Sequence, residues 1–269
     1  TDVYDGVAGC KHNRVLEGIR ARIQSEFNRR ILVESGKKQW EGKRILFVLP
    51  VTEPGGGAYV IIQECKALIE MGIDARILNY PKNKKAFEKN FPDLGVPVIY
   101  ENMSEIGSIA AEFDACIGTV NTTVEKLKTI EQTNGKPVMG YYIQDFEPYF
   151  YSSGSIDYLK AIESYTLIPS VCRVTKTQWN RDLLYSIVGV DCTIIGPSVD
   201  IDQFRPYAKQ SRLVNDTITI GALIRPSTPR RNPLFTLEVL GEIQEIYGSR
   251  VKIVTFGCTS DELDALEKP

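Results

Sequence analysis

The sequence has almost no histidine and no closely spaced pair of cysteines. His12 is the single histidine, and the six cysteines are scattered over 269 residues without any Cys-x-x-Cys spacing. Zinc sites combine several such ligands at short spacings, so we expect no metal ion and no other cofactor. Widely spaced thiols suit a reducing compartment better than an oxidising one. Cys116 and Cys172 lie in apolar runs and are expected to be buried.

The sequence also lacks long apolar runs and a strong excess of charge. Its formal net charge is -2, from 32 basic and 34 acidic residues, which gives no general attraction to nucleic acid. No apolar stretch approaches the ~20 residues that a membrane-spanning helix needs, and residues 1–10 contain no apolar signal core. These absences predict a cytoplasmic protein, and they leave open a peripheral association with the inner face of a membrane.

Residues 1–42 have the pattern of a helical extension. Apolar residues recur at helical spacing, and arginines lie between them. One interpretation is a basic amphipathic surface for a membrane or a partner; the other, which we favour, is a helix packed on the body with solvated arginines. The apolar positions are Val15, Ile19, Ile23 and Phe27, and the basic ones are Arg20, Arg22, Arg29 and Arg30.

The next part of the chain alternates short apolar runs with helical patterns. Residues 44–50 form an apolar run typical of a buried parallel strand, and a glycine triplet, a helix over 58–71 and a strand over 75–79 follow. This order predicts a doubly wound α/β domain over residues 43–205. Further strands are expected over 97–100, 115–118, 137–143, 172–175 and 192–195, and further helices over 104–112, 122–129, 156–165 and 178–188.

A second α/β unit is expected after a linker. Residues 200–216 are polar, contain a proline and have no clean period, whereas strand, helix and strand patterns follow over 217–223, 233–246 and 251–256. We therefore predict that residues 206–269 begin a second Rossmann-like domain. That domain is expected to be truncated, because a complete one needs more strands.

A glycine triplet separates the first strand from the first helix of the α/β part. Gly55, Gly56 and Gly57 would let a ligand approach the backbone closely, and the helix that follows offers free N–H groups to an anion. The spacing is not Gly-x-Gly-x-x-Gly, so the usual dinucleotide signal is absent. A turn that needs positive φ explains the triplet equally well.

Two segments carry a resemblance to a known family. Residues 195–206, Ile-Gly-Pro-Ser-Val-Asp-Ile-Asp-Gln-Phe-Arg-Pro, resemble the segment that ends the N-terminal domain in glycosyltransferase family 4. Residues 221–232, Gly-Ala-Leu-Ile-Arg-Pro-Ser-Thr-Pro-Arg-Arg-Asn, resemble the first strand-loop-helix of that family's C-terminal domain. The resemblance implies a GT-B fold, in which two Rossmann-like domains bind a nucleotide-sugar between them.

The resemblance also implies a site for the donor diphosphate. Arg225 and Arg231 stand at the family's diphosphate-binding positions, and Arg230 lies beside them. Fixed cations at the start of a helix would stabilise the negative charge of the departing diphosphate without a metal ion. The alternative interpretation is a solvated basic turn. The family's glutamate pair, which contacts the donor sugar, has no match before Pro269.

A polar and aromatic segment follows the expected strand over 137–143. Gln144, Asp145 and Glu147 lie among aromatic residues there, and strand ends in doubly wound sheets face the ligand crevice. Asp145 or Glu147 could act as a general base, and Tyr142, Gln144 and Asn121 could contact acceptor or sugar. A capped loop with aromatics in the core, and a helix cap around Asn121, are the competing interpretations. Residues 139–151 also resemble a segment of bacterial rhamnosyltransferases that build S-layer or cell-wall rhamnan chains.

Taken together, these patterns predict a glycosyltransferase. It would move a hexose, such as L-rhamnose from dTDP-rhamnose, to a glycan or lipid-linked acceptor. The alternative is a non-catalytic module that binds a nucleotide-sugar or a glycan within a larger assembly. A nucleotide-sugar 2-epimerase ranks lower, because such enzymes use a histidine in the cleft and His12 lies outside the expected core. The sequence predicts no particular oligomeric state.

Overall fold

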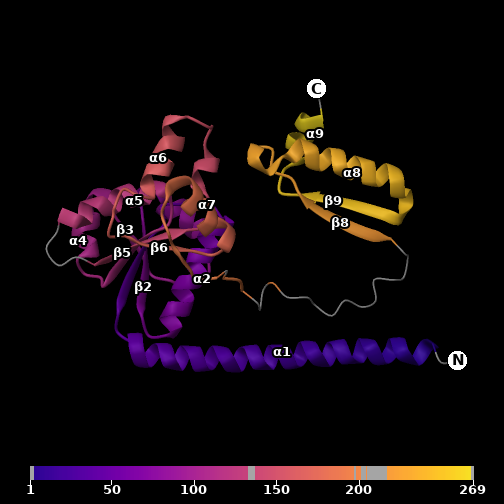
Figure 1. The fold of residues 1–269 in the computed structure, drawn as a ribbon, viewed down its shortest axis with the longest axis horizontal. Helices are drawn as coiled ribbons and strands as arrows, with labels where there is room; N and C mark the ends of the chain where they lie inside the picture. Colours follow the sequence, from indigo (N-terminus) through magenta and orange to yellow (C-terminus); the bar gives the residue numbers. More distant parts are fainter. Residues whose placement is uncertain (1–2, 133–136, 197, 201–203, 205–216, 268–269) are drawn as a thin grey trace. The chain divides into compact units, whose positions relative to one another are not determined.

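The chain divides into two compact units, Thr1–Asp200 and Ile201–Pro269. The computed structural model describes residues 3–132, 137–196, 198–200, 204 and 217–267 (Figure 1). The expected linker over 200–216 and the expected domain boundary at 205/206 lie almost wholly outside the described residues, as do Pro197 and Pro206 of the family-like segment.

The first unit is built on a parallel sheet of seven strands. Their order is β3-β2-β1-β4-β5-β6-β7, and each neighbouring pair runs in the same direction. The α/β fold class and the doubly wound sheet expected from the sequence are thereby confirmed. The strands are β1 Arg44–Val48, β2 Asp74–Asn79, β3 Val98–Tyr100, β4 Ala115–Gly118, β5 Val138–Ile143, β6 Cys172–Thr175 and β7 Thr193–Ile194.

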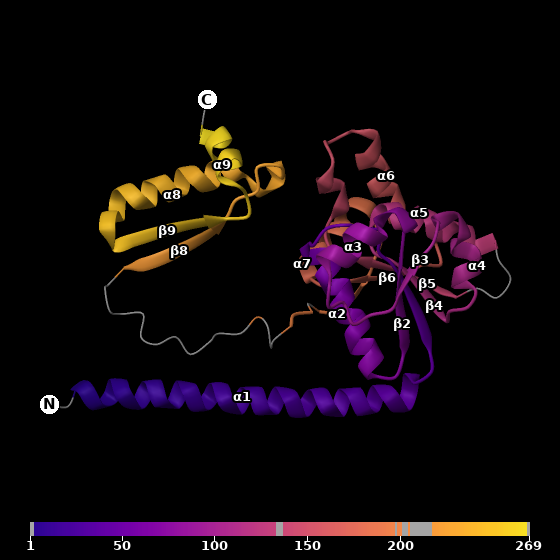
Figure 2. The same cartoon turned by 180° about the vertical axis from the view of Figure 1, so that it is seen from behind.

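Helices cover both faces of this sheet (Figures 1 and 2). Most of them lie where the apolar periodicity predicts them, but α3 and the short 3-10 turns were not expected. The helices of the α/β part are α2 Gly56–Glu70, α3 Lys84–Asn90, α4 Ile106–Ala110, α5 Asn121–Leu127, α6 Ile156–Ser164 and α7 Gln178–Val188. The 3-10 turns are η1 Pro81–Asn83, η2 Met103–Glu105, η3 Lys128–Gln132 and η4 Glu147–Phe150.

The alternation of side chains along each strand produces two hydrophobic cores. In β1, Leu46 and Val48 enter one core, with residues of α4 to α7, while Phe47 enters the other, with residues of α2 and α3. In β5, Tyr141 and Tyr142 divide in the same way. Because successive strand residues point to opposite faces, neighbours in sequence reach different cores. Burial of each large apolar side chain contributes about 1.5–3 kcal/mol.

The strand order reverses between β1 and β4. From β1 the chain winds through β2 to β3 on one side, and it then crosses to β4 on the other side of β1. Thr119, just after β4, donates a hydrogen bond of 2.6 Å to the carbonyl oxygen of Val48 and so joins the carboxyl ends of these two strands. In open α/β sheets, ligands bind outside the carboxyl ends of the strands at such a switch point.

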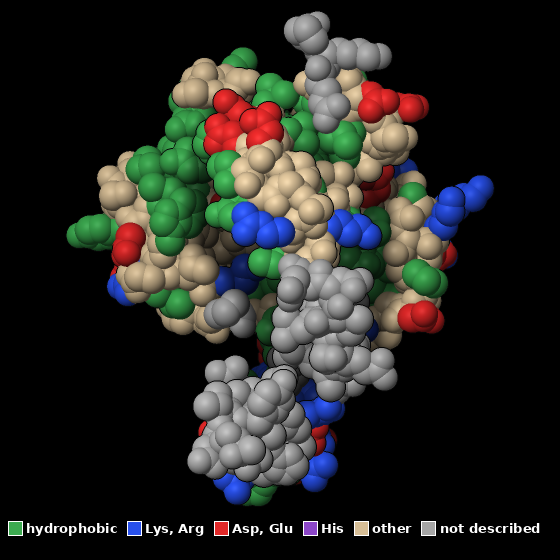
Figure 3. All heavy atoms as spheres, turned by 90° about the vertical axis from the view of Figure 1, so that its right-hand side faces the viewer, with side chains coloured by type: hydrophobic (Ala, Val, Ile, Leu, Met, Phe, Trp, Pro, Cys, Tyr) green, Lys and Arg blue, Asp and Glu red, His purple; other side chains and the backbone are tan. Residues whose placement is uncertain are grey.

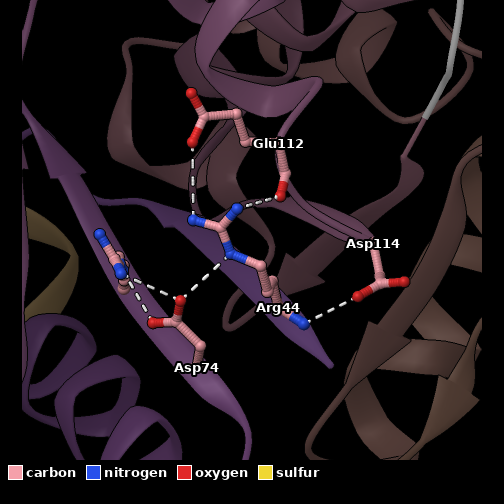
Figure 4. A network of polar contacts seen from close by, with 5 residues as sticks. Arg44, Asp74, Glu112 and Asp114 are labelled. Atoms are coloured by element: carbon pink, nitrogen blue, oxygen red, sulfur yellow. Dashed lines mark hydrogen bonds and ion pairs between the residues drawn. The ribbon is translucent and has the colours of Figure 1, made fainter. Parts of the chain in front are cut away.

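The opposite, amino-terminal edge of the sheet is held by an ionic network (Figure 4). The Arg44 guanidinium donates to Asp74 at 3.1 Å and to the carbonyl oxygen of Glu112 at 2.7 Å, and the backbone N–H of Arg44 donates to Asp114 at 2.8 Å. Arg76 also binds Asp74, at 2.7 Å, and its hydrogen bond is the main reason why the pKa of Asp74 lies below its usual value. This network connects the starts of β1, β2 and β4, away from the switch point.

The N-terminal extension is a single helix, α1 Val3–Trp40. Its described contacts with the body are to α2. Arg29 forms an ion pair of 2.6 Å with Glu70, and a Cβ at Gly36 would lie only 2.7 Å from the sulfur of Met71. Packing on the body is thus confirmed for this part of α1. Ile23, Phe27 and Ile31 are exposed, and their use as a membrane- or partner-binding surface stays a prediction.

The second unit contains a parallel pair of strands with a crossover helix. β8 Ile218–Leu223 and β9 Val251–Phe256 pair along their whole length, and α8 Pro233–Tyr247 connects them. The 3-10 turn η6 Pro229–Arg231 precedes α8, the turn η7 Gly248–Arg250 follows it, and α9 Ser260–Glu267 follows β9. Several large apolar side chains of β8, β9 and α8 are exposed. On the molecular face in Figure 3, hydrophobic side chains lie at the surface among charged and polar ones.

The expectations drawn from the cysteines are met only in part. All cysteines whose side chains are described are free thiols, and Cys116 is fully buried in β4. The expectation that Cys172 is buried is wrong, because this residue begins β6 at the amino edge of the sheet, where its side chain is exposed. Within the described residues, no helix has the length and hydropathy of a membrane span.

Candidate functional site

The glycine triplet lies at the carboxyl end of β1, where the chain enters α2. Gly55 is the N-cap of the helix and has an extended backbone, with φ -162° and ψ 159°. None of the three glycines has a positive φ, so the interpretation as a turn that requires positive φ is wrong. A Cβ at Gly55 or Gly56 would meet no atom within 4 Å. Neither backbone conformation nor internal packing requires glycine at these two positions.

The open space over these glycines adjoins the first N–H groups of α2. The first intrahelical hydrogen bond runs from Tyr59 N to the carbonyl oxygen of Gly55, and the N–H groups before Tyr59 have no partner in the helix. Such groups attract an anion or another acceptor. The geometry therefore matches a backbone surface that a ligand can approach closely.

Gln144 connects this glycine turn to the carboxyl end of β5. Its Nε2 donates to the carbonyl oxygen of Gly57 at 3.2 Å, and a Cβ on Gly57 would lie 3.3 Å from the same amide group. The Oε1 atom of Gln144 is buried and has no hydrogen-bond partner among the described atoms. The structure thus brings together two predicted site elements, which are 87 residues apart in sequence.

A polar cluster extends from this contact along α2. Glu64 accepts a hydrogen bond of 3.0 Å from the Tyr142 hydroxyl and a second one from the Ser198 hydroxyl. Tyr142 is only 3% exposed, and burial, together with the nearby charge of Glu64, raises the pKa of its hydroxyl. The predicted role of Tyr142 as an acceptor or sugar contact stays a prediction, since in this arrangement its hydroxyl already donates to Glu64.

Lys176 follows β6 directly and is half-buried. Burial lowers the pKa of its ammonium group, whereas the charges of Glu64 and Asp145 raise it. We call Gly57, Glu64, Tyr142, Gln144, Lys176 and Ser198 the carboxyl-edge cluster, since they lie around the carboxyl ends of β1, β5 and β6.

Glu147 lies in the interior, on the other face of the sheet. It is 2% exposed and accepts hydrogen bonds from the backbone N–H of Asn121 and, at 2.9 Å, from the Tyr141 hydroxyl. Its own backbone N–H donates to the Tyr165 hydroxyl at 2.9 Å. Burial raises the pKa of Glu147 to about 8, although the two donors lower it. In this position the carboxylate holds protein groups in place and has no access to a ligand at the surface.

Asp145 occupies a more accessible neighbouring position, whereas Asn121 is buried. Asp145 is half-buried, and one of its oxygens accepts from the backbone N–H of Phe146 at 2.9 Å. Asn121 begins α5, and its Oδ1 accepts from the Tyr151 hydroxyl at 3.2 Å. The expected cap of this helix is supplied by Thr123, whose hydroxyl accepts from two backbone N–H groups that precede the helix. A role for Asp145 as a base stays a prediction.

The three predicted arginines lie together in the second unit. Arg225 follows β8, and Arg230 and Arg231 belong to the 3-10 turn Pro229–Arg231 that precedes α8. All three side chains are exposed. Asn232 has φ 48° and forms the N-cap of α8, and Pro233 begins the helix. Three exposed arginines therefore precede a helix N-terminus within a short stretch of sequence, and guanidinium groups at a helix start suit an anion; their role in binding a diphosphate stays a prediction.

Sequence reasoning missed three members of the carboxyl-edge cluster. Lys176 could have been found from the rule for strand ends, because it follows β6 directly. Glu64 lies seven residues, or about two helical turns, after Gly57, and this spacing places both on one face of α2. Ser198 lies in the family-like segment over residues 195–206, and nothing in the sequence indicates its contact with Glu64.

Among the described residues there is no group of three or more histidine, cysteine or acidic side chains positioned to hold a metal ion. The expectation that no cofactor is needed stays a prediction.

Comparisons with known proteins give distant structural likenesses. No family model matches this chain, and no curated protein matches it. The chain is similar to apo saccharopine dehydrogenase (L-Glu forming) from Saccharomyces cerevisiae at 13% identity and a TM-score of 0.31, over 54% of this chain and 30% of that one. It is similar to MurG from Acinetobacter baumannii at 9% identity and a TM-score of 0.40, over 83% of this chain and 71% of that one. The chain therefore spans less than a third of the length of the dehydrogenase.

Proposed function

We propose that this chain belongs to a glycosyltransferase of the GT-B class. It would transfer a hexose from a nucleotide-sugar to a hydroxyl group of a glycan or a lipid-linked acceptor. The finer proposal is that the donor is dTDP-L-rhamnose, which rests on the resemblance of residues 139–151 to bacterial rhamnosyltransferases.

The glycine turn is the observation that carries this proposal. Gly55 and Gly56 lie at the strand-order reversal of a doubly wound sheet, have no positive φ, and leave the space of a Cβ empty. Close approach of a ligand to the backbone is the remaining physical reason for glycine there. The partnerless N–H groups of α2 supply donors for oxygen atoms of the donor sugar or its phosphates.

We call Arg225, Arg230 and Arg231, which lie between β8 and α8, the arginine turn. This turn supports a diphosphate as the anionic part of the donor. Arginine presents planar, permanently charged donors that can bind two phosphate oxygens at once. The negative charge of the leaving diphosphate grows as the sugar departs, so cations fixed beside it stabilise the transition state more than the ground state. Arg225 and Arg231 match the family pattern for this role, and Arg230 lies between them in the turn.

Asp145 is the proposed base for the acceptor hydroxyl. It follows β5 at the carboxyl edge and is half-buried, whereas Glu147 is enclosed by Tyr141, Asn121 and Tyr165. We therefore reassign Glu147 from base to a positioning residue, which holds the start of α5 against the loop after β5.

Donor binding tests the arginine turn. Arg231→Ala in the full chain should weaken the binding of dTDP-rhamnose or of a UDP-hexose about 10- to 100-fold, the loss expected for a charged hydrogen-bonding pair. Titration calorimetry measures this change. Arg250→Ala is the matched control, because it removes another exposed arginine of the same unit, one that lies over the ring of Tyr247. Equal affinity of wild type and Arg231→Ala for every nucleotide-sugar that binds would overturn the assignment of the turn.

A non-catalytic binding module is the second candidate, and the burial of Glu147 favours it. With that side chain enclosed, Asp145 is the one remaining carboxylate of the two predicted bases. A transfer assay with a bound donor separates the two functions: release of nucleoside diphosphate that falls strongly in Asp145→Asn indicates an enzyme. Tight donor binding without any release, with or without acceptor, indicates a module.

A further inference from the structure

The first unit has a cavity of about 330 Å³ beside the start of α5. Its walls come from α5, from α6 and from Tyr151, which follows η4. Since α5 begins just after β4, the cavity lies at the carboxyl edge of the sheet, near the strand-order reversal. It lies on the face of the sheet that contains Glu147, whereas the carboxyl-edge cluster lies around α2.

Asn121 presents an unpaired donor at this cavity. The side chain is 5% exposed and is held from two sides: its backbone N–H donates to Glu147, and its Oδ1 accepts from the Tyr151 hydroxyl. Its Nδ2 donates to no atom of the described residues, although Asn121 lines the cavity. Nδ2 is not among the buried side-chain atoms that lack a partner, so this N–H group is open to the cavity, while Oδ1 is held by Tyr151. A fixed amide with its N–H group open to a cavity can donate a hydrogen bond to a ligand there.

Four charged side chains surround the same cavity. Glu125, Asp157 and Glu163 carry negative charge and Lys160 carries positive charge, so the lining has a net charge of -2. All four side chains are exposed. None of these four side chains forms an ion pair or a hydrogen bond with another described side chain. The three carboxylates are not grouped in a way that could hold a metal ion. They are therefore available as acceptors for an organic ligand.

The charge of the cavity decides which ligand fits. A net negative lining disfavours phosphates and carboxylates, because like charges repel without a compensating partner. It favours a neutral ring with many hydroxyl groups, which can donate to the carboxylates and accept from Asn121. The ring of Tyr151 supplies an apolar surface against which a sugar ring can pack.

We propose that this cavity binds a neutral sugar of the acceptor, and that it rejects acidic sugars. The proposal rests on the proposed function, because it assigns the acceptor rather than the donor of the transfer. The diphosphate of the donor is excluded from the cavity by the same carboxylates that bind the acceptor hydroxyls. Asn121 and Tyr151 orient the sugar, and neither takes part in a chemical step.

Binding of two matched sugars to the full chain tests this assignment. Methyl β-D-glucoside and methyl β-D-glucuronide differ only in the carboxylate at C6, and saturation-transfer NMR at low salt compares their affinities. The wild type should bind the glucoside and bind the glucuronide at least about fivefold more weakly, the scale of one like-charge contact near a surface. The double variant Asp157→Asn/Glu163→Gln keeps the shape of the lining but removes two charges, and it should lose most of this discrimination.

The control removes a distant charge of the same unit. Asp93→Asn changes an exposed carboxylate in the loop between α3 and β3 and should keep the wild-type discrimination. Equal binding of both sugars by the wild type, no binding of the glucoside, or unchanged discrimination in the double variant would each overturn the proposal. A chain that binds nucleotide-sugars normally but fails this test loses only the acceptor assignment. A chain that passes it without binding any nucleotide-sugar loses the proposed transferase function.

Discussion

Glu147 shows how one buried carboxylate can make the stability of the chain depend on pH. Its pKa is raised by burial from an ordinary value of 4.5 to about 8. Between these two values the folded protein therefore binds a proton that the unfolded chain has lost. The folded state is then progressively disfavoured as the pH rises, because a charge must be accommodated among Tyr141, Tyr165 and Asn121.

The variant Glu147→Gln should remove this pH dependence. For the wild type, we expect the free energy of unfolding to fall between pH 4.5 and pH 8 by up to about 1.4 kcal/mol per pH unit from this group, and to level off above its folded pKa. Glu147→Gln should lack that decrease and should gain stability relative to the wild type as the pH rises. Urea unfolding followed by tryptophan fluorescence at several pH values measures the free energy of unfolding of both proteins. Glu163→Gln, an exposed change of the same kind, should keep the wild-type slope, and parallel curves for Glu147→Gln and wild type would contradict the account.

At the scale of elements, the first turn of α2 has to form a stable helix and, in the proposed function, has to leave room for a ligand at its backbone. Glycine is an unfavourable residue within a helix, yet Gly56 and Gly57 form the first two residues of α2. Gly57 is constrained by the Gln144 amide, whereas Gly56 faces open space. The contact with Gln144 therefore explains in part why residue 57 is glycine. No internal contact explains the glycine at position 56, which the proposed function explains by the close approach of a ligand.

Gly56→Ala should separate stability from binding. The added methyl group enters empty space and favours the helix, so the free energy of unfolding should stay level or rise by about 0.4–1 kcal/mol. The affinity for the nucleotide-sugar should fall, because the same methyl group occupies the space proposed for the donor. Gly241→Ala is a matched control within α8, where a Cβ also meets nothing within 4 Å. Denaturant titration and calorimetry on both variants decide the question, and undiminished donor affinity in Gly56→Ala would count against a ligand at the glycine turn.

At the scale of the whole molecule, the two units have very different cores. The first unit has two large clusters of buried residues, one on each face of its sheet. The described part of the second unit has four buried residues, Ile224, Pro233, Leu240 and Val251. A small core buries a smaller fraction of its surface and is correspondingly less stable.

Unfolding of the full chain should therefore occur in two steps. Both tryptophans, Trp40 and Trp179, lie in the first unit, so their fluorescence should report the later step, whereas circular dichroism should report both. A nucleotide-sugar bound by the arginine turn should move the earlier transition to a higher denaturant concentration, since a ligand stabilises the state that binds it. Coincident transitions by the two methods would show that the units unfold as one.

The success of the sequence predictions varied between elements for identifiable reasons. β4, β6 and β9 were predicted with their observed bounds, because buried parallel strands appear as short apolar runs. α3, in contrast, has a single buried residue, Phe87, in a segment rich in lysine, and such a helix leaves little apolar periodicity to detect. The exposure of Cys172 was missed because its position at the edge of the sheet depends on neighbouring strands.

The sequence by itself determined the alternation of strands and helices, the glycine turn after β1 and the arginine turn before α8, because these depend on local periodicity and residue type. Only the tertiary structure decided which side chains meet. The strand order brings residues 57 and 144 together, and the alternation of β5 sends Tyr141 toward Glu147 and Tyr142 toward Glu64. These contacts join segments far apart in the chain, and their partners depend on the assembled sheet, which no local pattern specifies.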